Sequence, residues 1–303
     1  MQGKKILVLL MLFLAWAIQA AAAPADPVAS QITMGGEVRT YWMYAPASLD
    51  KAKPAPLLFV LHGSAGSGED MMTITQRGFE RIADKEKFVV VYPDALERRW
   101  NDQDGTVDDA GFLLAVVDKL AAELLIDKKQ VYVAGISNGG MMAQRMACEF
   151  SDRVAGIAIV AGSMPEVLAG KCKPARPLPV IIFHGVEDPI VPWNGGAVAG
   201  FEDFGKVLSV RKTAEFWAAN SRCREAAVGA PEPDRDLGEG TRVRLEKFAD
   251  CASKAEVSLV VIEGGGHTWP GGYQYLPERF IGKTSRDIDA NRIIWDFFRR
   301  LSH

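Results

Sequence analysis

A serine between two glycines constrains this chain more than any other feature of its sequence. The pentapeptide GISNG at residues 135–139 follows the apolar run 131–134 and opens a helix-like stretch at residues 141–150. Glycine is needed on both sides, because a side chain at either place would strike the strand or the helix in so tight a turn. This context predicts a nucleophile elbow with Ser137 as the reactive residue, and an ordinary strand-to-helix glycine turn is the alternative.

A nucleophilic serine needs a general base, and the sequence holds four histidines: His62, His184, His267 and His303. In chains with such an elbow, an acid and then a histidine follow the serine. His267 lies in the glycine-rich segment 264–272, directly after the strand-like run 257–262, and we expect it to be the base. His62 precedes the serine, and His303 is the last residue, where fraying is the default. A histidine satisfied in a surface turn is the alternative for His267.

The carboxylate that orients this base is expected at Asp188. The apolar run 179–183 predicts a strand, and Asp188 lies one short loop beyond its carboxyl end, where functional groups of parallel sheets gather. Glu187 is the competing acid, because the sequence alone does not fix the rotation of the loop. His184 is expected to support this loop by hydrogen bonding.

Residues 62–68 form a second glycine-rich loop, which continues from the strand-like run 57–61. A loop at this place normally donates one backbone N–H to the negative oxygen of a tetrahedral intermediate. Ser64 is the expected donor, and the backbone N–H of Asn138 is the expected second donor. A phosphate-binding loop is disfavoured, because no Lys-Ser or Lys-Thr follows at the spacing of a P-loop.

Outside these motifs, apolar runs alternate with amphipathic segments. Residues 39–44, 57–61 and 88–92 predict strands, and residues 109–126, 209–220 and 287–301 predict helices. This alternation indicates an α/β fold with a mostly parallel sheet covered on both faces. The length of 303 residues and a hydrophobic share of 48% suit one large domain.

The amino-terminal segment predicts export. Lys4 and Lys5 precede the apolar run 6–18, and small residues follow up to residue 23. We expect residues 1–22 to be a signal peptide, leaving residues 23–303 as a single catalytic domain, secreted to the periplasm or the medium. A retained membrane anchor is the alternative, although the run is shorter than the roughly 20 residues that span a bilayer.

The four cysteines are an even number in a chain expected to be exported, so we expect disulfides. Cys148 with Cys172 and Cys223 with Cys251 are the preferred pairs, because each closes one local loop, and the other two pairings stay open. None of the spacings suits a zinc site, so neither a metal nor another cofactor is expected. The net charge is −3 and the sequence has no basic stripe, so nucleic acid is not an expected partner.

Six segments together resemble the secreted polyhydroxybutyrate depolymerase and feruloyl esterase group: residues 57–63, 100–102, 108–113, 135–141, 184–192 and 266–272. The resemblance covers nearly the whole mature chain and implies an α/β-hydrolase fold. It also implies that Ser137, Asp188 and His267 form a catalytic triad. It does not separate polyester substrates from feruloylated or acetylated plant polysaccharides.

We therefore predict an exported serine esterase that acts through an acyl-enzyme, with no membrane association after signal cleavage. A polyhydroxybutyrate depolymerase-like enzyme is preferred. Because the chain ends just after its last helix, without a linker and an adsorption domain, we expect it to act on oligomers or soluble esters rather than on insoluble polymer. A feruloyl or acetylxylan esterase is the alternative, ahead of a serine peptidase or a noncatalytic binding module. Trp193 and Trp269 flank the acid and the base, and are expected to wall the substrate pocket unless they are core rings.

Overall fold

The computed structural model describes residues 25–301 apart from 104–106, 200–204, 225, 232–235, 237 and 239. The predicted signal peptide at residues 1–22 and His303 lie outside the described residues. Within this range, none of the helices is both long enough and apolar enough to cross a membrane.

A ten-stranded sheet forms the centre of the described chain, in the order β1-β2-β4-β3-β5-β6-β7-β12-β11-β10. The six strands from β4 to β12 run parallel, and the two strands added at each edge are antiparallel to their neighbours. The strand bounds are β1 (Val28–Met34), β2 (Glu37–Tyr44), β3 (Ala55–Leu61), β4 (Val89–Pro93), β5 (Ile126–Ile136), β6 (Gly156–Val160), β7 (Val180–Gly185), β10 (Ala226–Pro231), β11 (Arg242–Phe248) and β12 (Val257–Glu263).

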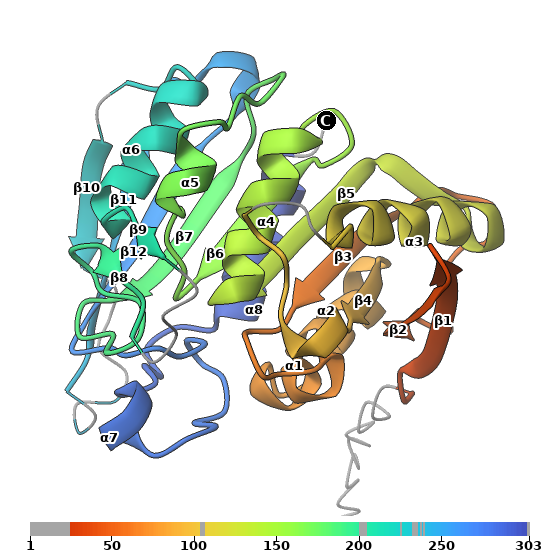
Figure 1. The fold of residues 1–303 in the computed structure, drawn as a ribbon, viewed down its shortest axis with the longest axis horizontal. Helices are drawn as coiled ribbons and strands as arrows, with labels where there is room; N and C mark the ends of the chain where they lie inside the picture. Colours follow the sequence, from red (N-terminus) through yellow and green to blue (C-terminus); the bar gives the residue numbers. More distant parts are fainter. Residues whose placement is uncertain are drawn as a thin grey trace, which may run out of the picture.

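Helices cover both faces of this sheet (Figure 1). They are α1 (Gly68–Ile74), α2 (Gly78–Glu86), α3 (Asp109–Leu124), α4 (Asn138–Glu149), α5 (Glu166–Ala169), α6 (Val210–Asn220), α7 (Glu278–Ile281) and α8 (Ala290–Leu301). A small hairpin of β8 (Gly196–Ala197) and β9 (Lys206–Val207) lies apart from the main sheet.

The core is divided by the sheet into two apolar clusters, as a strand period of two requires. On β3, Leu57 and Phe59 belong to the cluster on the side of α3, α4 and α6, whereas Leu58 belongs to the cluster on the opposite side, with α1, α2 and α8. Because both faces are covered, the central strands are apolar at nearly every position. The predicted α/β architecture with a mostly parallel sheet is therefore confirmed.

The helix predicted at residues 109–126 has different bounds at its carboxyl end. The side chain of Asp108 caps the amino end by accepting a hydrogen bond from the N–H of Gly111 at 2.8 Å. The helix ends at Leu124, because Leu125 takes a left-handed conformation with φ 54° and Ile126 already begins β5. The other two predicted helices correspond to α6 and α8, and α8 begins three residues later than expected.

Both predicted disulfides are present. Cys148 of α4 is bonded to Cys172 after α5, and Cys223 after α6 is bonded to Cys251 after β11. The first bridge ties α4 to the loop after α5, and the second joins the loop after α6 to the loop after β11, so the predicted connectivity is confirmed.

Candidate active site

Four loops that carry predicted site residues meet at one edge of the sheet. The loops follow β3, β5, β7 and β12, which are parallel strands, so their carboxyl ends lie at the same edge. Helices α1 and α7 lie at this edge as well (Figure 1). The sequence therefore brings the expected serine, acid and base to one place through strand order alone.

Ser137 occupies a strained turn between β5 and α4. Its backbone has φ 55° and ψ −123°, and its N–H donates to the carbonyl of Val160 at 2.9 Å. A Cβ at Gly135 would lie 2.4 Å from the backbone of Gly139, and a Cβ at Gly139 would lie 2.5 Å from two carbonyl oxygens at the end of β3. The predicted strand–turn–helix geometry and its need for both glycines are confirmed.

His267 and Asp188 form a buried hydrogen-bonded pair. His267 Nδ1 lies 2.8 Å from Asp188 Oδ2, while Asp188 Oδ1 accepts backbone hydrogen bonds from Ile190 and Val191 at 2.8 Å each. Burial opposes ionisation of Asp188, but the charge of His267 and these hydrogen bonds outweigh it and hold the pKa of Asp188 below its usual value. An ionised Asp188 keeps the proton on Nδ1, which leaves Nε2 free to accept another.

Glu187 and His184, the other two titratable residues of the segment 184–192, do not act as the partner of His267. Glu187 is exposed, so the structure favours Asp188 as the partner of His267. His184 is buried, and its Nε2 lies 2.9 Å from the carbonyl oxygen of Val191 and 3.5 Å from Asp188 Oδ2. Burial lowers the pKa of His184, which favours a neutral ring. The predicted role of His184 in supporting this loop is confirmed.

Close backbone packing holds the segment that carries His267. A Cβ at Gly185 would lie 2.2 Å from the carbonyl oxygen of Gly265, and a Cβ at Gly266 would lie 2.1 Å from that of Ile281. Tyr275 donates its hydroxyl proton to the carbonyl of His267 at 2.8 Å. These contacts explain why glycines precede both Asp188 and His267 in the sequence.

A cavity of about 550 Å³ opens beside these groups. Ser137, His267 and Ser64 all line it, so the predicted nucleophile, base and oxyanion loop face one space. No hydrogen bond joins the Ser137 hydroxyl to the His267 ring among the described contacts, and such bonds are often long before a substrate binds. The remaining walls are mostly apolar, and they include Ile74, Ile190, Tyr273, Tyr275, Leu276 and Ile281.

Comparison with known proteins agrees with this geometry. The phospholipase/carboxylesterase family model matches residues 92–201. A protein of Nocardia uniformis subsp. tsuyamanensis named "Putative esterase NocK" is 33% identical over 295 residues, which are 91% of this chain and 83% of that protein. The chain belongs to the α/β-hydrolase esterase group.

More distant relatives of this esterase include fungal proteins. Feruloyl esterase B of Piromyces equi is 28% identical over 233 residues, which are 73% of this chain but only 41% of that longer protein. The solved acetyl xylan esterase of Aspergillus awamori superposes with a TM-score of 0.58 at 16% identity, over 80% of this chain and 94% of that one. That structural likeness shows the fold.

The expectation that Trp269 walls the pocket is wrong. Its side chain is fully buried, donates Nε1–H to Asn291 Oδ1 at 3.0 Å, and meets the ring of Phe79 edge-on with centroids 6.0 Å apart. Trp193 is partly buried near His184 and does not line this cavity either. Tyr273, Tyr275 and Leu276 line the cavity instead of the tryptophans. In the sequence, these residues could have been suspected because two tyrosines follow the glycines at 271 and 272 within three residues.

The loop expected to provide an oxyanion donor comes close to the elbow of the esterase. A Cβ at Gly63 would lie 3.3 Å from the Cβ of Ser137, and Ser64 lines the cavity. Asn138 begins α4, where the first N–H groups of a helix have no partner within it. The roles of Ser64 and Asn138 as oxyanion donors stay predictions that this arrangement permits.

His62, the remaining described histidine, supports the loop that carries Ser64. Its Nδ1 lies 2.6 Å from the carbonyl oxygen of Gly63, and its Nε2 accepts a hydrogen bond from the backbone N–H of Ala95 at 3.0 Å. Burial lowers the pKa of His62, so both contacts fit a neutral ring. The ring therefore holds the start of the loop in place.

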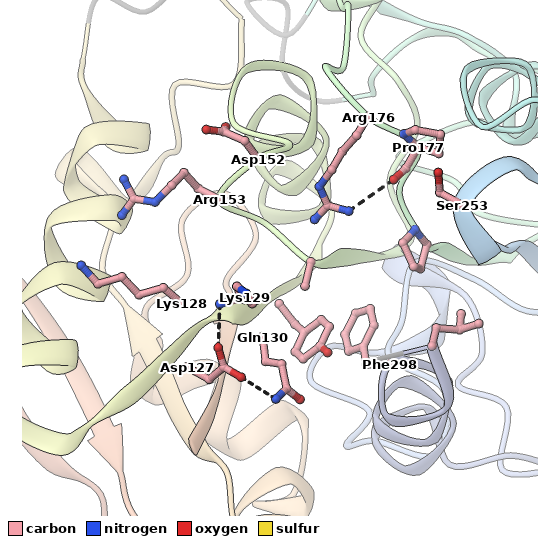
Figure 2. A pocket seen from close by; sticks show the side chains of 14 residues that line it. Asp127, Lys128, Lys129, Gln130, Asp152, Arg153, Arg176, Pro177, Ser253 and Phe298 are labelled. Atoms are coloured by element: carbon pink, nitrogen blue, oxygen red, sulfur yellow. Dashed lines mark hydrogen bonds between the residues drawn. The ribbon is translucent and has the colours of Figure 1, made fainter. Parts of the chain in front are cut away.

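A larger pocket of about 670 Å³ lies away from this chemistry, at the amino ends of the strands (Figure 2). Its polar groups bond to one another and to nearby backbone: Asp127 accepts from the Lys129 N–H and from Gln130, and Arg176 donates to the carbonyl of Val154. The esterase presents no serine–histidine–acid set there, so we place the chemistry in the smaller cavity.

Asp102 lies behind the elbow and gives a testable effect of pH. Asp102 Oδ1 accepts a hydrogen bond from Asn138 Nδ2 at 2.9 Å, and burial raises the pKa of Asp102 to about 7. An unfolded aspartate titrates at about pH 4, so between about pH 4 and 7 the unfolded state loses a proton that the folded state keeps. This group therefore makes the protein less stable as pH rises through that window.

We expect Asp102→Asn to remove this dependence, because the amide oxygen still accepts the bond from Asn138 without carrying a charge. Urea unfolding at pH 5 and pH 8 should show that the variant gains stability relative to the original protein as pH rises. Asp152→Asn, which changes an exposed carboxylate, is the control and should follow the original protein. Equal pH dependence in all three proteins would contradict the assignment.

Proposed function

We propose that this chain is an exported serine esterase that hydrolyses carboxylic esters through an acyl-enzyme. The observation that carries the proposal is that Ser137, in a strained elbow, and His267, bonded to a buried Asp188, line one cavity. Membership of the esterase group supports the reaction class. This arrangement disfavours a noncatalytic binding module, and the esterase relatives disfavour a serine peptidase.

In the proposed first half-reaction, His267 Nε2 takes the proton of Ser137 as Oγ forms a bond to the ester carbonyl carbon. The carbonyl oxygen becomes negative, and the backbone N–H groups of Ser64 and Asn138 stabilise it. His267 then gives the proton to the departing alcohol oxygen as the carbon–oxygen bond breaks. Asp188 orients the imidazole and stabilises its charged form.

In the second half-reaction, water attacks the acyl carbon while His267 takes one of its protons. The bond from the acyl carbon to Ser137 Oγ breaks, and His267 returns that proton to the serine. A carboxylic acid leaves, and the resting protein is restored. These steps require only groups of the chain and water, so the mechanism needs neither a cofactor nor a metal.

The apolar wall of the cavity bears on the substrate. Tyr273, Tyr275 and Leu276 favour an acyl or alcohol group with an aromatic or apolar surface. Relatives named as feruloyl esterases support an ester of a plant polysaccharide. Hydroxybutyrate oligomers, which the motif resemblance equally allows, are the second candidate. Parallel hydrolysis of methyl ferulate, acetylated xylan and hydroxybutyrate oligomers would rank these substrates directly.

We expect Tyr273→Ala to lower kcat/KM for methyl ferulate by about three- to tenfold, the loss of one aromatic contact. Hydrolysis of methyl acetate should change much less, because neither its acyl nor its alcohol group is large enough to contact the wall. Phe280→Ala is the matched control, because Phe280 is 56% exposed, close to the 55% of Tyr273, yet does not line the cavity. Equal effects of the two substitutions on methyl ferulate would remove Tyr273 from the substrate site.

We also propose that residues 1–22 direct export and that residues 23–303 form the catalytic domain. Two disulfides support an oxidising compartment, where such bonds form and persist. Amino-terminal sequencing of the protein from the medium or periplasm should begin at Ala23. A chain that retains Met1 there would contradict cleavage.

A further inference from the structure

Trp100 is attached to the loop that carries Ser64. The indole is fully buried, and its Nε1–H donates to the carbonyl oxygen of His62 at 2.9 Å. The ring also packs against the imidazole of His62, with centroids 5.1 Å apart and an interplanar angle of 39°. Any movement of the start of the oxyanion loop therefore disturbs Trp100.

The backbone of the same residue is attached to the elbow. The N–H of Trp100 donates to Asn138 Oδ1 at 2.7 Å, and Asn138 Nδ2 donates back to the carbonyl of Trp100 at 3.0 Å. The Asn138 amide is fully buried and bonds to Asp102 as well. Trp100 thus binds one loop through its side chain and the first residue of α4 through its main chain.

The segment that carries Trp100 is itself anchored to helices. The N–H of Asn101 donates to Asp109 Oδ2 at 2.7 Å, and Arg145 of α4 donates to the Asn101 carbonyl. Asp109 at the start of α3 also pairs with buried Arg39 at 2.5 Å. The segment 100–102 is therefore bonded to the start of α3, within residues 108–113, and to α4. Neither segment has a role in the proposed reaction steps.

We propose that Trp100 is a positioning residue that sets the spacing between the backbone N–H groups of Ser64 and Asn138. The inference rests on the proposed esterase function, because it concerns the negative oxygen of that reaction. Fixed donors stabilise this oxygen because they need no reorganisation as charge develops. The loop from residue 62 to 68 contains three glycines, and left without a brace it would have many accessible conformations.

The test is Trp100→Phe, which keeps a large ring in the core and removes the N–H donor to His62. We expect kcat for p-nitrophenyl butyrate to fall about 10- to 100-fold, with KM within about twofold, because misplaced groups weaken binding of the transition state more than of the substrate. The inhibition constant of a trifluoromethyl ketone, whose adduct with serine carries a negative oxygen, should rise by a similar factor.

Trp217→Phe is the matched control. Trp217 is also a buried indole, and its Nε1–H donates to Gln144 Oε1 of α4 at 3.1 Å, away from the cavity. The two variants lose the same chemical group, so they should lose similar thermal stability. Only Trp100→Phe should lose kcat and affinity for the ketone.

Asn138→Ala provides a second test, because it breaks the other end of the support while keeping the backbone N–H. It should also lower kcat, and the double variant should lose much less than the product of the two single effects, since both act on the same spacing. Unchanged kcat and ketone affinity in Trp100→Phe, or equal losses in Trp217→Phe, would overturn the positioning role. Ester hydrolysis that persists in Ser137→Ala would instead overturn the proposed function itself.

Discussion

Replacing His267 with alanine should lower kcat for p-nitrophenyl esters by about 10⁴- to 10⁶-fold, since the serine, base and acid act as a unit. The expected loss is large because Ser137 would have no group in the cavity placed to accept its proton. Thermal stability should also fall, because Asp188 would be left buried without its partner, so folding must be measured in the same variant. Stopped assays at high enzyme concentration, together with circular dichroism, would measure both effects. A loss below tenfold in a folded variant would exclude His267 as the base.

Asp188→Asn should lower kcat by about 10⁴-fold, because an amide next to His267 Nδ1 no longer holds the ring in the tautomer that leaves Nε2 free. Glu187→Gln is the matched control: the same change of carboxylate to amide, one residue earlier, at an exposed position. It should alter kcat by no more than about twofold. The reverse ranking of the two variants would assign the acid to Glu187.

The elbow and the acid–base pair could be predicted because each follows a strand whose apolar run is readable in the sequence. Parallel strands then place the loops after β5, β7 and β12 at one edge, so no long-range information was needed to bring Ser137, Asp188 and His267 together. The choice between Asp188 and Glu187 required the structure. Only the folded loop shows that Asp188 accepts bonds from Ile190 and Val191 and turns its other oxygen to His267.

The pocket walls could not be predicted in the same way. Trp269 lies two residues from His267, but the sequence does not state the direction of either side chain. The structure directs His267 into the cavity and Trp269 into the core, where Asn291 satisfies its N–H. Tyr273 and Leu276 line the cavity in a segment that is bonded to the end of α1, where the N–H of Tyr273 donates to the carbonyl of Ile74 at 2.9 Å.

Strands β10 and β11, at one antiparallel edge of the sheet, were not predicted. Strand β11 mixes four charged residues with Val243, Leu245 and Phe248, so it lacks the continuous apolar run that revealed the central strands. Strand β10 is built from alanine, glycine, valine and proline, which give little strand signal. By contrast, the disulfide pairs followed from sequence separations of 24 and 28, which left each cysteine near one partner along the chain.

The supporting role of residues 100–102 illustrates a different limit. The sequence shows Trp-Asn-Asp as part of a resemblance, but the bonds that join Trp100 and Asp102 to His62 and Asn138 connect segments more than 30 residues apart. Such contacts have no local pattern. They become visible only when the ends of β3 and β5 lie side by side, as their parallel pairing requires.

The most direct test of the central claim is covalent labelling with a fluorophosphonate, followed by peptide mapping of the adduct. An activated serine displaces fluoride from phosphorus, so one equivalent should attach to the original protein and map to the peptide that contains Ser137. Ser137→Ala should remain unlabelled while unfolding at nearly the same temperature. Labelling that persists at full stoichiometry in folded Ser137→Ala, or that maps to another residue, would contradict the account.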